Sequence, residues 1–426
     1  MKKLIYTTVI FLGLIANAQL PNYEQNFEKE SLRLDFFLSG THQSEQVILH
    51  QMKKEPFYAA ASSHQLIYPA FGNYRIEIKD ATTEELLFSK GFNPLFEEWQ
   101  HTAEAKKITR TFENTLQLPF PKKDIVIEIS KRAKKGQFEK IYSQEISPNN
   151  YNILKESIVK YPVQQIAGNL PSEKAIDLAI IAEGYTADEM DKFVSDARRM
   201  MDYTFTIPPF DQYKNQFNVY AILSPSIDSG TDIPGEGIYK NTAVDSRFYT
   251  FDEPRYLTVP SIYKIADIAA NVPYDHVYVL VNTPRYGGGG FYNVLNIATS
   301  DHALSDKVFV HEFGHGFAGL ADEYYTSSVP AEEMIYSLDI EPWEPNITTL
   351  INFDAKWKSK VKKGTPIPTP RTKKYKDEVG VFEGGGYSDK GIYSPVQDCR
   401  MKSNEPKGFC PVCSSAIQGI IEFYTK

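Results

Sequence analysis

The sequence predicts an α+β protein of several domains, in which an N-terminal antiparallel β-sandwich is followed by an α/β domain. Two observations support this fold class. Short alternating strands separated by polar turns fill the first 150 residues. Apolar strand patterns and helical patterns then alternate after about residue 173, which is typical of a layer of parallel strands. The chain has 426 residues, enough for two or three domains of ~150 residues each.

The N-terminus has the pattern of a secretory signal peptide. A basic pair, Lys2 and Lys3, precedes an apolar run over residues 4–15, and Ala16-Asn17-Ala18 provides a small-x-small cleavage site. The apolar run is shorter than the ~20 residues that a membrane span needs. We therefore expect residues 1–18 to be removed, and we expect an exported protein without a transmembrane anchor.

The overall charge argues against one class of partner. The mature and leader residues together carry 46 Lys and Arg against 54 Asp and Glu, a net charge of −8. Nucleic acids attract basic patches, so a nucleic-acid partner is not expected. The sequence contains no signal for the oligomeric state.

Residues 19–150 are predicted to form the β-sandwich. Residues 32–38, 74–78 and 125–130 alternate between apolar and polar side chains, as half-buried strands do. No group of catalytic residue types stands out here, so we expect an accessory domain. Residues 151–172 contain Pro, Asn and Gly and are predicted to be a linker.

Residues 173–426 are predicted to form the α/β domain. A capping box at 186–189 and apolar spacing over 262–270 predict helices between the strands. The expected buried strands cover residues 175–182, 217–223 and 276–282.

A glycine run over residues 286–290 is predicted to be a flexible turn leading into a strand over 292–298. If that strand lay at the sheet edge, it could align an extended peptide by strand addition. The alternative is a hairpin with no role in substrate binding. The next helix should be capped by Asp301 or Ser305 and should end near residues 316–319.

That helix contains the pattern His-Glu-x-x-His. His311 and His315 are four residues apart, so both imidazoles leave one face of the helix. Two neutral imidazoles at this spacing can bind Zn²⁺ at roughly 2.0–2.1 Å. Glu312 can take a proton from zinc-bound water and pass it to a leaving amine. The pattern predicts one catalytic Zn²⁺.

A catalytic zinc ion needs a third protein ligand. His315 is the last histidine of the chain, so a ligand further along must be a carboxylate or something weaker. Asp322 follows a glycine at 319, which resembles the metzincin pattern with Asp in place of His. Glu323 is the alternative, and a glutamate on a separate helix, Glu332 or Glu333, is another. Two histidines that precede the helix, His276 and His302, are weaker candidates.

Further site residues are predicted in the last fifty residues. Met401 lies in a turn after the zinc helix and is expected to be a Met-turn beneath the metal ligands. Tyr387 and Tyr393 are candidates for stabilising the oxyanion or contacting substrate. Cys410 and Cys413 have the spacing of half a zinc ribbon, but no second Cys or His pair completes it. One local disulfide is therefore expected, joining Cys399 to Cys410 or to Cys413.

These motifs resemble those of the bacterial IgA-peptidase-type zinc metallopeptidases. The resemblance rests on residues 311–324, on 383–387, and on the motifs at 399–401 and 409–413. It implies a metzincin-like zinc peptidase domain, with His311, His315 and Asp322 as ligands, Glu312 as base and Met401 as the Met-turn residue. Gut-bacterial members have an N-terminal β domain like residues 19–150.

Two functional hypotheses follow. The first is an exported bacterial zinc endopeptidase, periplasmic, secreted or associated with the cell surface, that hydrolyses protein or peptide substrates. Immunoglobulin A or other host proteins are candidate substrates. The second is a cell-surface module that binds protein or glycan and contains a vestigial peptidase domain. The intact His-Glu-x-x-His pattern favours the first.

Overall fold

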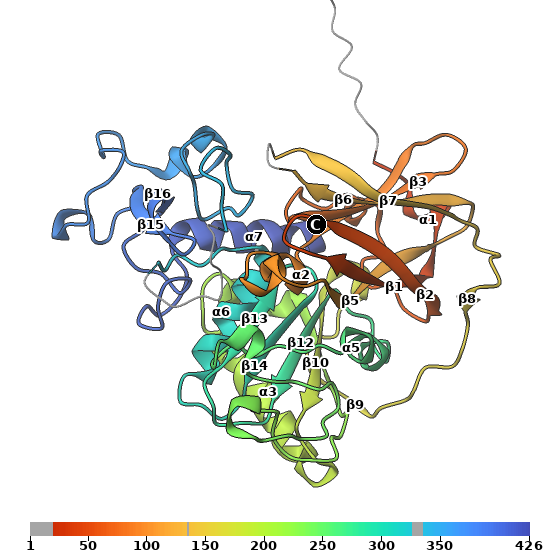
Figure 1. Ribbon diagram of the computed structural model, residues 1–426. Coiled ribbons are helices and arrows are strands. Elements are labelled where there is room, and N and C mark those ends of the chain that lie inside the picture. The colour runs from red at the N-terminus through yellow and green to blue at the C-terminus, as the bar shows by residue number, and fades with distance from the viewer. Residues whose placement is uncertain (1–19, 134–135, 326–334) are drawn as a thin grey trace, which may run out of the picture.

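The structure is a computed structural model that describes residues 20–133, 136–325 and 335–426 (Figure 1). The expected signal peptide, residues 1–18, lies outside the described residues. Among the described helices, none is long and apolar enough to cross a membrane.

The N-terminal region contains two four-stranded sheets, in the orders β5-β1-β2-β8 and β4-β3-β6-β7. All neighbours are antiparallel except β2 and β8, which are parallel. The predicted antiparallel β region is therefore confirmed. Two short helices, α1 (Tyr23–Asn26) and α2 (Leu95–Gln100), accompany the strands. The strands are β1 (Phe27–Gly40), β2 (Glu45–Glu55), β3 (Tyr74–Asp80), β4 (Leu86–Phe92), β5 (Arg110–Pro121), β6 (Ile125–Arg132), β7 (Phe138–Ile146) and β8 (Ile153–Leu154).

Side-chain alternation explains how these sheets share a core. Along β3, Tyr74, Ile76 and Ile78 are buried, whereas the intervening side chains are partly exposed, as the period of two in a strand requires. The apolar faces of both sheets contribute to one hydrophobic cluster. Phe36 of β1 and Phe92 of β4 meet edge to face within it, with ring centroids 6.3 Å apart.

The later region is built on a six-stranded mixed sheet with the order β13-β14-β12-β10-β11-β9. Its four central strands, β11, β10, β12 and β14, run parallel, and the two edge strands are antiparallel to their neighbours. This confirms the predicted α/β layer. The strands are β9 (Val163–Ala167), β10 (Ile176–Glu183), β11 (Phe217–Ile222), β12 (His276–Val281), β13 (Gly288–Phe291) and β14 (Leu295–Thr299).

The residues expected to be a linker, 151–172, hold two short strands. β8 pairs with the N-terminal sheet, and β9 forms the outer edge of the later sheet. The segment therefore contributes a strand to each side that it connects (Figure 1).

Where the structure describes the later region, five α-helices and a hairpin accompany the sheet, together with short 3-10 turns. The capping box of Thr186 and Glu189 is present before α3, as predicted. The helices are α3 (Met190–Thr204), α4 (Phe210–Tyr213), α5 (Ile262–Ala269), α6 (Ser305–Ala318) and α7 (Pro411–Thr425), and the hairpin is β15 (Phe382–Gly385) and β16 (Ser388–Ser394).

Helix α6 carries the histidine pair and ends as predicted. Gly319 closes it in the left-handed conformation (φ 63°), which glycine adopts at little cost. The predicted side-chain cap is wrong: Leu304 is the N-cap and makes no side-chain cap hydrogen bond. The Ser305 hydroxyl accepts a hydrogen bond from the backbone N–H of His302 instead.

The glycine run does not form the predicted turn. Residues Gly288–Phe291 are β13, the edge strand, and the strand predicted over 292–298 begins later, at Leu295. Strand β14 lies inside the sheet, next to β12, so the glycine-rich strand β13 forms the edge. A close approach to α6 explains this composition. A Cβ added at Gly290 would lie 2.4 Å from the carbonyl oxygen of Glu312 and 2.7 Å from the Cβ of His315.

Gly290→Ala is expected to displace α6 from the sheet, because its new methyl group meets backbone rather than a flexible side chain. Overpacking of this kind costs about 1–3 kcal/mol, which should appear in the free energy of unfolding and in a loss of activity. Gly289→Ala is the matched control, since its nearest contact would be 3.2 Å. Equal stability of the two variants would contradict the close approach.

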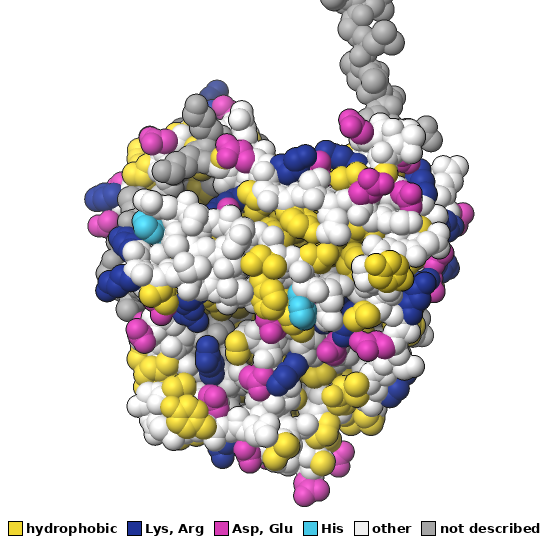
Figure 2. All heavy atoms as spheres, turned by 45° about the vertical axis from the view of Figure 1, so that its right-hand side comes forward, with side chains coloured by type: hydrophobic (Ala, Val, Ile, Leu, Met, Phe, Trp, Pro, Cys, Tyr) yellow, Lys and Arg dark blue, Asp and Glu magenta, His cyan; other side chains and the backbone are white. Residues whose placement is uncertain are grey.

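The last helix joins the two regions. Gln65 donates a hydrogen bond from Nε2 to the carbonyl of Tyr424 (2.6 Å), and the rings of Tyr68 and Phe423 lie 4.7 Å apart. Figure 1 shows α7 running from beside the β15–β16 hairpin to the N-terminal sheets. On the face in Figure 2, acidic and basic side chains are interspersed around hydrophobic ones.

Candidate active site

Helix α6 and two backbone carbonyl groups, one just after the helix and one far along the chain, orient the histidine pair. The Nδ1 atom of His311 lies 2.9 Å from the carbonyl oxygen of Arg400, and Nδ1 of His315 lies 2.6 Å from that of Leu320. A backbone carbonyl can only accept, so both Nδ1 atoms carry the proton. The lone pairs of the two Nε2 atoms are thereby left facing one another, 3.1 Å apart.

Asp322 completes a triangle with the two imidazoles. Its Oδ1 atom lies 3.1 Å from Nε2 of His311 and 3.3 Å from Nε2 of His315. Three ligands of one tetrahedral Zn²⁺, with bonds near 2.0–2.2 Å, would be separated by ~3.4 Å. Asp322 Oδ1 is buried and accepts no hydrogen bond from residues 20–133, 136–325 or 335–426. The three atoms therefore fit a metal ion, which would supply the missing partner of this oxygen.

The charges of these groups depend on one another in the metal-free protein. Burial alone would lower the pKa of His315, but the Asp322 carboxylate outweighs it and raises the value to about 9. Burial would raise the pKa of Asp322, but the two imidazoles hold it below its usual range. A metal ion bound between His315 and Asp322 would take the place of the proton that these two side chains otherwise share.

Tyr387 holds the other oxygen of the carboxylate. Its hydroxyl donates a hydrogen bond to Asp322 Oδ2, and its backbone N–H donates to the carbonyl of Tyr324 (3.0 Å). The predicted residue thus lies in the site, with its hydroxyl on Asp322. It orients the oxygen Oδ1 toward the histidines.

Tyr387→Phe is expected to weaken metal binding without removing a ligand. Loss of a partner that orients a ligand typically costs 10–100-fold in metal affinity or activity, and a fall of about tenfold is expected here. The measurement is competition for zinc with a chelator of known affinity. Tyr393→Phe is the control, because Tyr393 does not line the cavity. An unchanged zinc affinity in Tyr387→Phe would contradict the orienting role.

Glu312 lies on α6 next to the ligand triangle and faces the glycine edge strand. A Cβ at Gly288 would lie 2.6 Å from Glu312 Oε1, so the missing side chain makes room for this carboxylate. Burial raises the pKa of Glu312, and the nearby imidazoles oppose that effect. A carboxylate with a raised pKa is better suited to accept and return a proton near neutral pH.

Met401 lies under α6, in the predicted turn. Backbone N–H groups of Lys402 and Ser403 both donate to the carbonyl of Cys399, which closes the turn. Met401 is fully buried, and a Cβ at Gly314 would lie 2.8 Å from its Sδ atom. The methionine therefore forms an apolar floor one residue away from His315.

Several predicted residues lie elsewhere. Glu323 points away from the histidines and contacts Cys413, with Oε1 3.2 Å from its Sγ. Tyr393 lies in β16, where its backbone pairs with Thr348. His276 is buried against aromatic rings, and His302 packs against Tyr286. Glu332 and Glu333 lie outside the described residues.

The expected disulfide is absent from the structure. Cys399, Cys410 and Cys413 are all buried free thiols. The Sγ atoms of Cys399 and Cys413 are 3.8 Å apart, whereas a disulfide requires ~2.05 Å.

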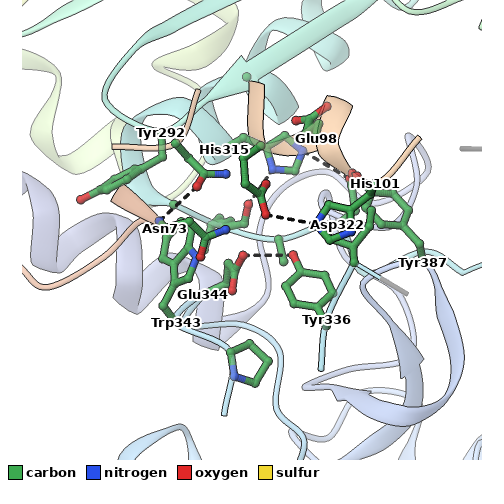
Figure 3. A pocket seen from close by; sticks show the side chains of 18 of the residues that line it. Asn73, Glu98, His101, Tyr292, His315, Asp322, Tyr336, Trp343, Glu344 and Tyr387 are labelled. Atoms are coloured by element: carbon green, nitrogen blue, oxygen red, sulfur yellow. Dashed lines mark hydrogen bonds and ion pairs between the residues drawn. The ribbon is translucent and has the colours of Figure 1, made fainter. Parts of the chain in front are cut away.

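A cavity of about 1060 Å³ opens above the ligand triangle, and both regions of the chain line it. Figure 3 shows Asn73, Glu98 and His101 of the N-terminal region around the same space as His315 and Asp322. Glu98 lies in α2, and the hydroxyl of Tyr256 donates to its Oε2. Burial raises the pKa of Glu98 to about 7. Sequence reasoning missed these residues, because no short-range pattern connects α2 to α6.

A histidine pair, an adjacent carboxylate and a glutamate on the same helix, below a cavity of this size, are the groups that a metallopeptidase site requires. Comparison with protein families agrees. Residues 165–377 and 371–421 match the model described as IgA Peptidase M64, and residues 22–143 match Peptidase M64 N-terminus. No curated protein matches the chain. The chain belongs to the IgA peptidase M64 family of metallopeptidases, which confirms the resemblance in the sequence.

Proposed function

We propose that this protein is a zinc-dependent endopeptidase with His311, His315 and Asp322 as ligands and Glu312 as general base. The observation that carries the proposal is the triangle of two Nε2 atoms and one Oδ1 atom, with sides of 3.1 to 3.3 Å. Two imidazoles and one carboxylate are a donor set typical of catalytic zinc, with a fourth position left for water.

The ligand order supports a metzincin-like catalytic domain. The helical histidine pair, the left-handed Gly319, the carboxylate at Asp322 and the buried turn at Met401 follow one another in the chain. We propose that Asp322 takes the place of the third histidine of that arrangement.

Each group at the site has a definable task. Zinc bound to the triangle would lower the pKa of a bound water toward ~7 and polarise the substrate carbonyl. Glu312 accepts the proton of the attacking water and returns it to the leaving amine. Tyr387 keeps Asp322 oriented through Oδ2. The carboxylates of the partly buried Glu98 and the buried Glu344, both with a pKa raised to about 7 by desolvation, add further polar groups to the cavity wall.

A folded or extended polypeptide fits this site better than a small molecule. The cavity is open, large and lined by residues of both regions. β13 lies at the sheet edge beside Glu312; β14 pairs with it on one side, and on the other side Tyr256 bridges to Gly288, at the start of the strand. We propose that part of the substrate lies along β13 in extended form, as strand addition allows. The N-terminal β region, as a packed sandwich, would select substrates through the opposite wall.

The signal-peptide pattern of residues 1–18 supports export. We infer a protein substrate met outside the cytoplasm, in the periplasm, at the cell surface or in the medium. Immunoglobulin A appears in the family description and is the first protein to test.

Metal removal tests the proposal. Treatment of the mature protein with a chelator should abolish cleavage of a quenched peptide library, because the water-activating group is lost. Dialysis followed by one equivalent of Zn²⁺ should restore cleavage. Full activity of a protein shown to be free of metal would contradict the proposed function. Mg²⁺ addition is the control, since a hard cation prefers an oxygen cage.

A further inference from the structure

The three cysteines and Glu323 form a buried cluster behind the active site. The ligand atoms of Glu323, Cys399, Cys410 and Cys413 all lie within 4.8 Å of one another, and all four residues are buried. Three separate stretches of chain supply them: the segment after α6, the turn at Met401, and the start of α7. We propose that this cluster binds a second, structural Zn²⁺.

The spacing of the sulfur atoms fits a metal ion better than a disulfide. Two thiolates bound to one tetrahedral Zn²⁺, with Zn–S bonds of ~2.3 Å, are separated by ~3.8 Å. Cys399 Sγ and Cys413 Sγ are 3.8 Å apart. Cys413 Sγ and Glu323 Oε1 are 3.2 Å apart, where a shared zinc ion would place its sulfur and oxygen ligands ~3.6 Å apart.

One oxygen of the Glu323 carboxylate is buried without a partner among the residues that the structure describes. The side chain is fully buried, and within that part of the chain Oε2 has no hydrogen-bond partner. Oε1 is held by Asn346, whose Nδ2 donates to it at 3.0 Å. A buried carboxylate oxygen left unpaired is costly, and a cation in the thiol cluster would satisfy it.

Backbone groups already point at the sulfur atoms. The N–H of Cys410 lies 3.2 Å from Sγ of Cys399, and the N–H of Cys413 lies 3.5 Å from Sγ of Cys410. Cys410 is also the N-cap of α7, where the helix dipole favours negative charge. These donors would offset part of the charge of three thiolates and one carboxylate. Cys410 and Cys413 therefore form half of a zinc site, and Cys399 and Glu323 complete it.

The second site would brace the first. Glu323 directly follows Asp322, and Cys399 directly precedes Arg400, whose carbonyl accepts the Nδ1–H of His311. The backbone N–H of Glu323 also donates to the carbonyl of Met401 (2.8 Å). A zinc ion bound to Glu323 and Cys399 would fix the positions of the residues next to them, which are the ligand Asp322 and Arg400, the partner of His311.

Metal counting tests this proposal on the mature full chain, purified without chelator. We expect about two zinc ions per chain, and about one in a His311→Ala/His315→Ala variant, which lacks the catalytic pair. Zinc analysis by mass spectrometry gives the count. Loss of all zinc from His311→Ala/His315→Ala, or a Cys399–Cys413 disulfide in peptide maps made without reductant, would overturn the proposal.

Cobalt substitution separates the two sites without relying on activity. The protein reconstituted with Co²⁺ should show a thiolate-to-cobalt charge-transfer band, which imidazole and carboxylate ligands cannot produce. The band should persist in His311→Ala/His315→Ala and should weaken in Cys413→Ser. Absence of the band from the cobalt-loaded wild type would contradict the thiolate site. If the band is absent but the zinc-loaded protein cleaves peptides, the second site is contradicted and the proposed function is not. If the band is present but no peptide is cleaved, the proposed function is contradicted and the second site is not.

Discussion

Glu312→Gln is expected to bind zinc as the wild type does and to lose nearly all peptide hydrolysis. The glutamine amide has the shape of the carboxylate but cannot accept the proton of the attacking water. Positioned general acid–base groups contribute about 10²–10⁴-fold, so kcat should fall by about that factor. Because Glu312 is not one of the three groups of the ligand triangle, zinc content should stay at the wild-type value.

The measurement combines zinc analysis with initial rates on a quenched peptide. Glu236→Gln is a suitable control, since Glu236 is exposed and its carboxylate only pairs with Arg285 at the surface. Glu312→Ala should reproduce the loss. If Glu312→Gln cleaved at the wild-type rate, another group would have to move the proton.

Asp322→Asn is expected to lose the catalytic zinc ion. The substitution keeps the side-chain shape but removes the negative charge that faces two imidazoles at 3.1 and 3.3 Å. Loss of an orienting partner already costs 10–100-fold in metal affinity, so loss of a direct ligand should cost more than about 100-fold. Activity at limiting zinc should fall in parallel, and excess zinc should recover part of it.

Asp306→Asn is the matched control, because Asp306 lies in the first turn of the same helix and pairs with Arg199. It makes the same change of charge without touching the triangle. Wild-type zinc affinity in Asp322→Asn would mean that the third ligand is another residue, and Glu332 and Glu333 would then be tested.

The residues that the sequence could place are those connected by local geometry. One turn of helix brings His311 and His315 together, and the glycine turn at 319 returns the chain so that Asp322 follows at short range. The sequence favoured Asp322 over Glu323 as the third ligand, and in the structure the Asp322 carboxylate lies beside the histidines while Glu323 contacts Cys413. The backbone of this segment bonds to two different neighbours. The N–H of Gly386 donates to the carbonyl of Asp322, whereas the N–H of Glu323 donates to the carbonyl of Met401. Neighbouring side chains of such an extended segment point in opposite directions.

The missed features depend on contacts between distant parts of the chain. Glycine is a poor strand former, so the run at 286–290 indicated a turn. Gly288–Phe291 nevertheless pairs with β14 as a strand, and α6 approaches Gly288 and Gly290 too closely for a side chain at either position. Glu98 was missed for a similar reason, since its partner Tyr256 is 158 residues further along the chain. The predicted disulfide is not formed in the structure, where all three cysteines are free thiols and the sulfur atoms of Cys399 and Cys413 are 3.8 Å apart.

The order of the site along the chain has a consequence for the timing of biosynthesis. The Arg400 carbonyl that accepts from His311 lies 89 residues after it, in the turn that also supplies Met401. Helix α7 follows this turn, and the carbonyl of its Tyr424 accepts a hydrogen bond from Gln65 of the N-terminal region. A nascent chain therefore exposes its histidine helix before the partner of His311 and the apolar floor beneath it have been made. The arrangement around the two histidines can form only after the turn at Met401 has left the ribosome.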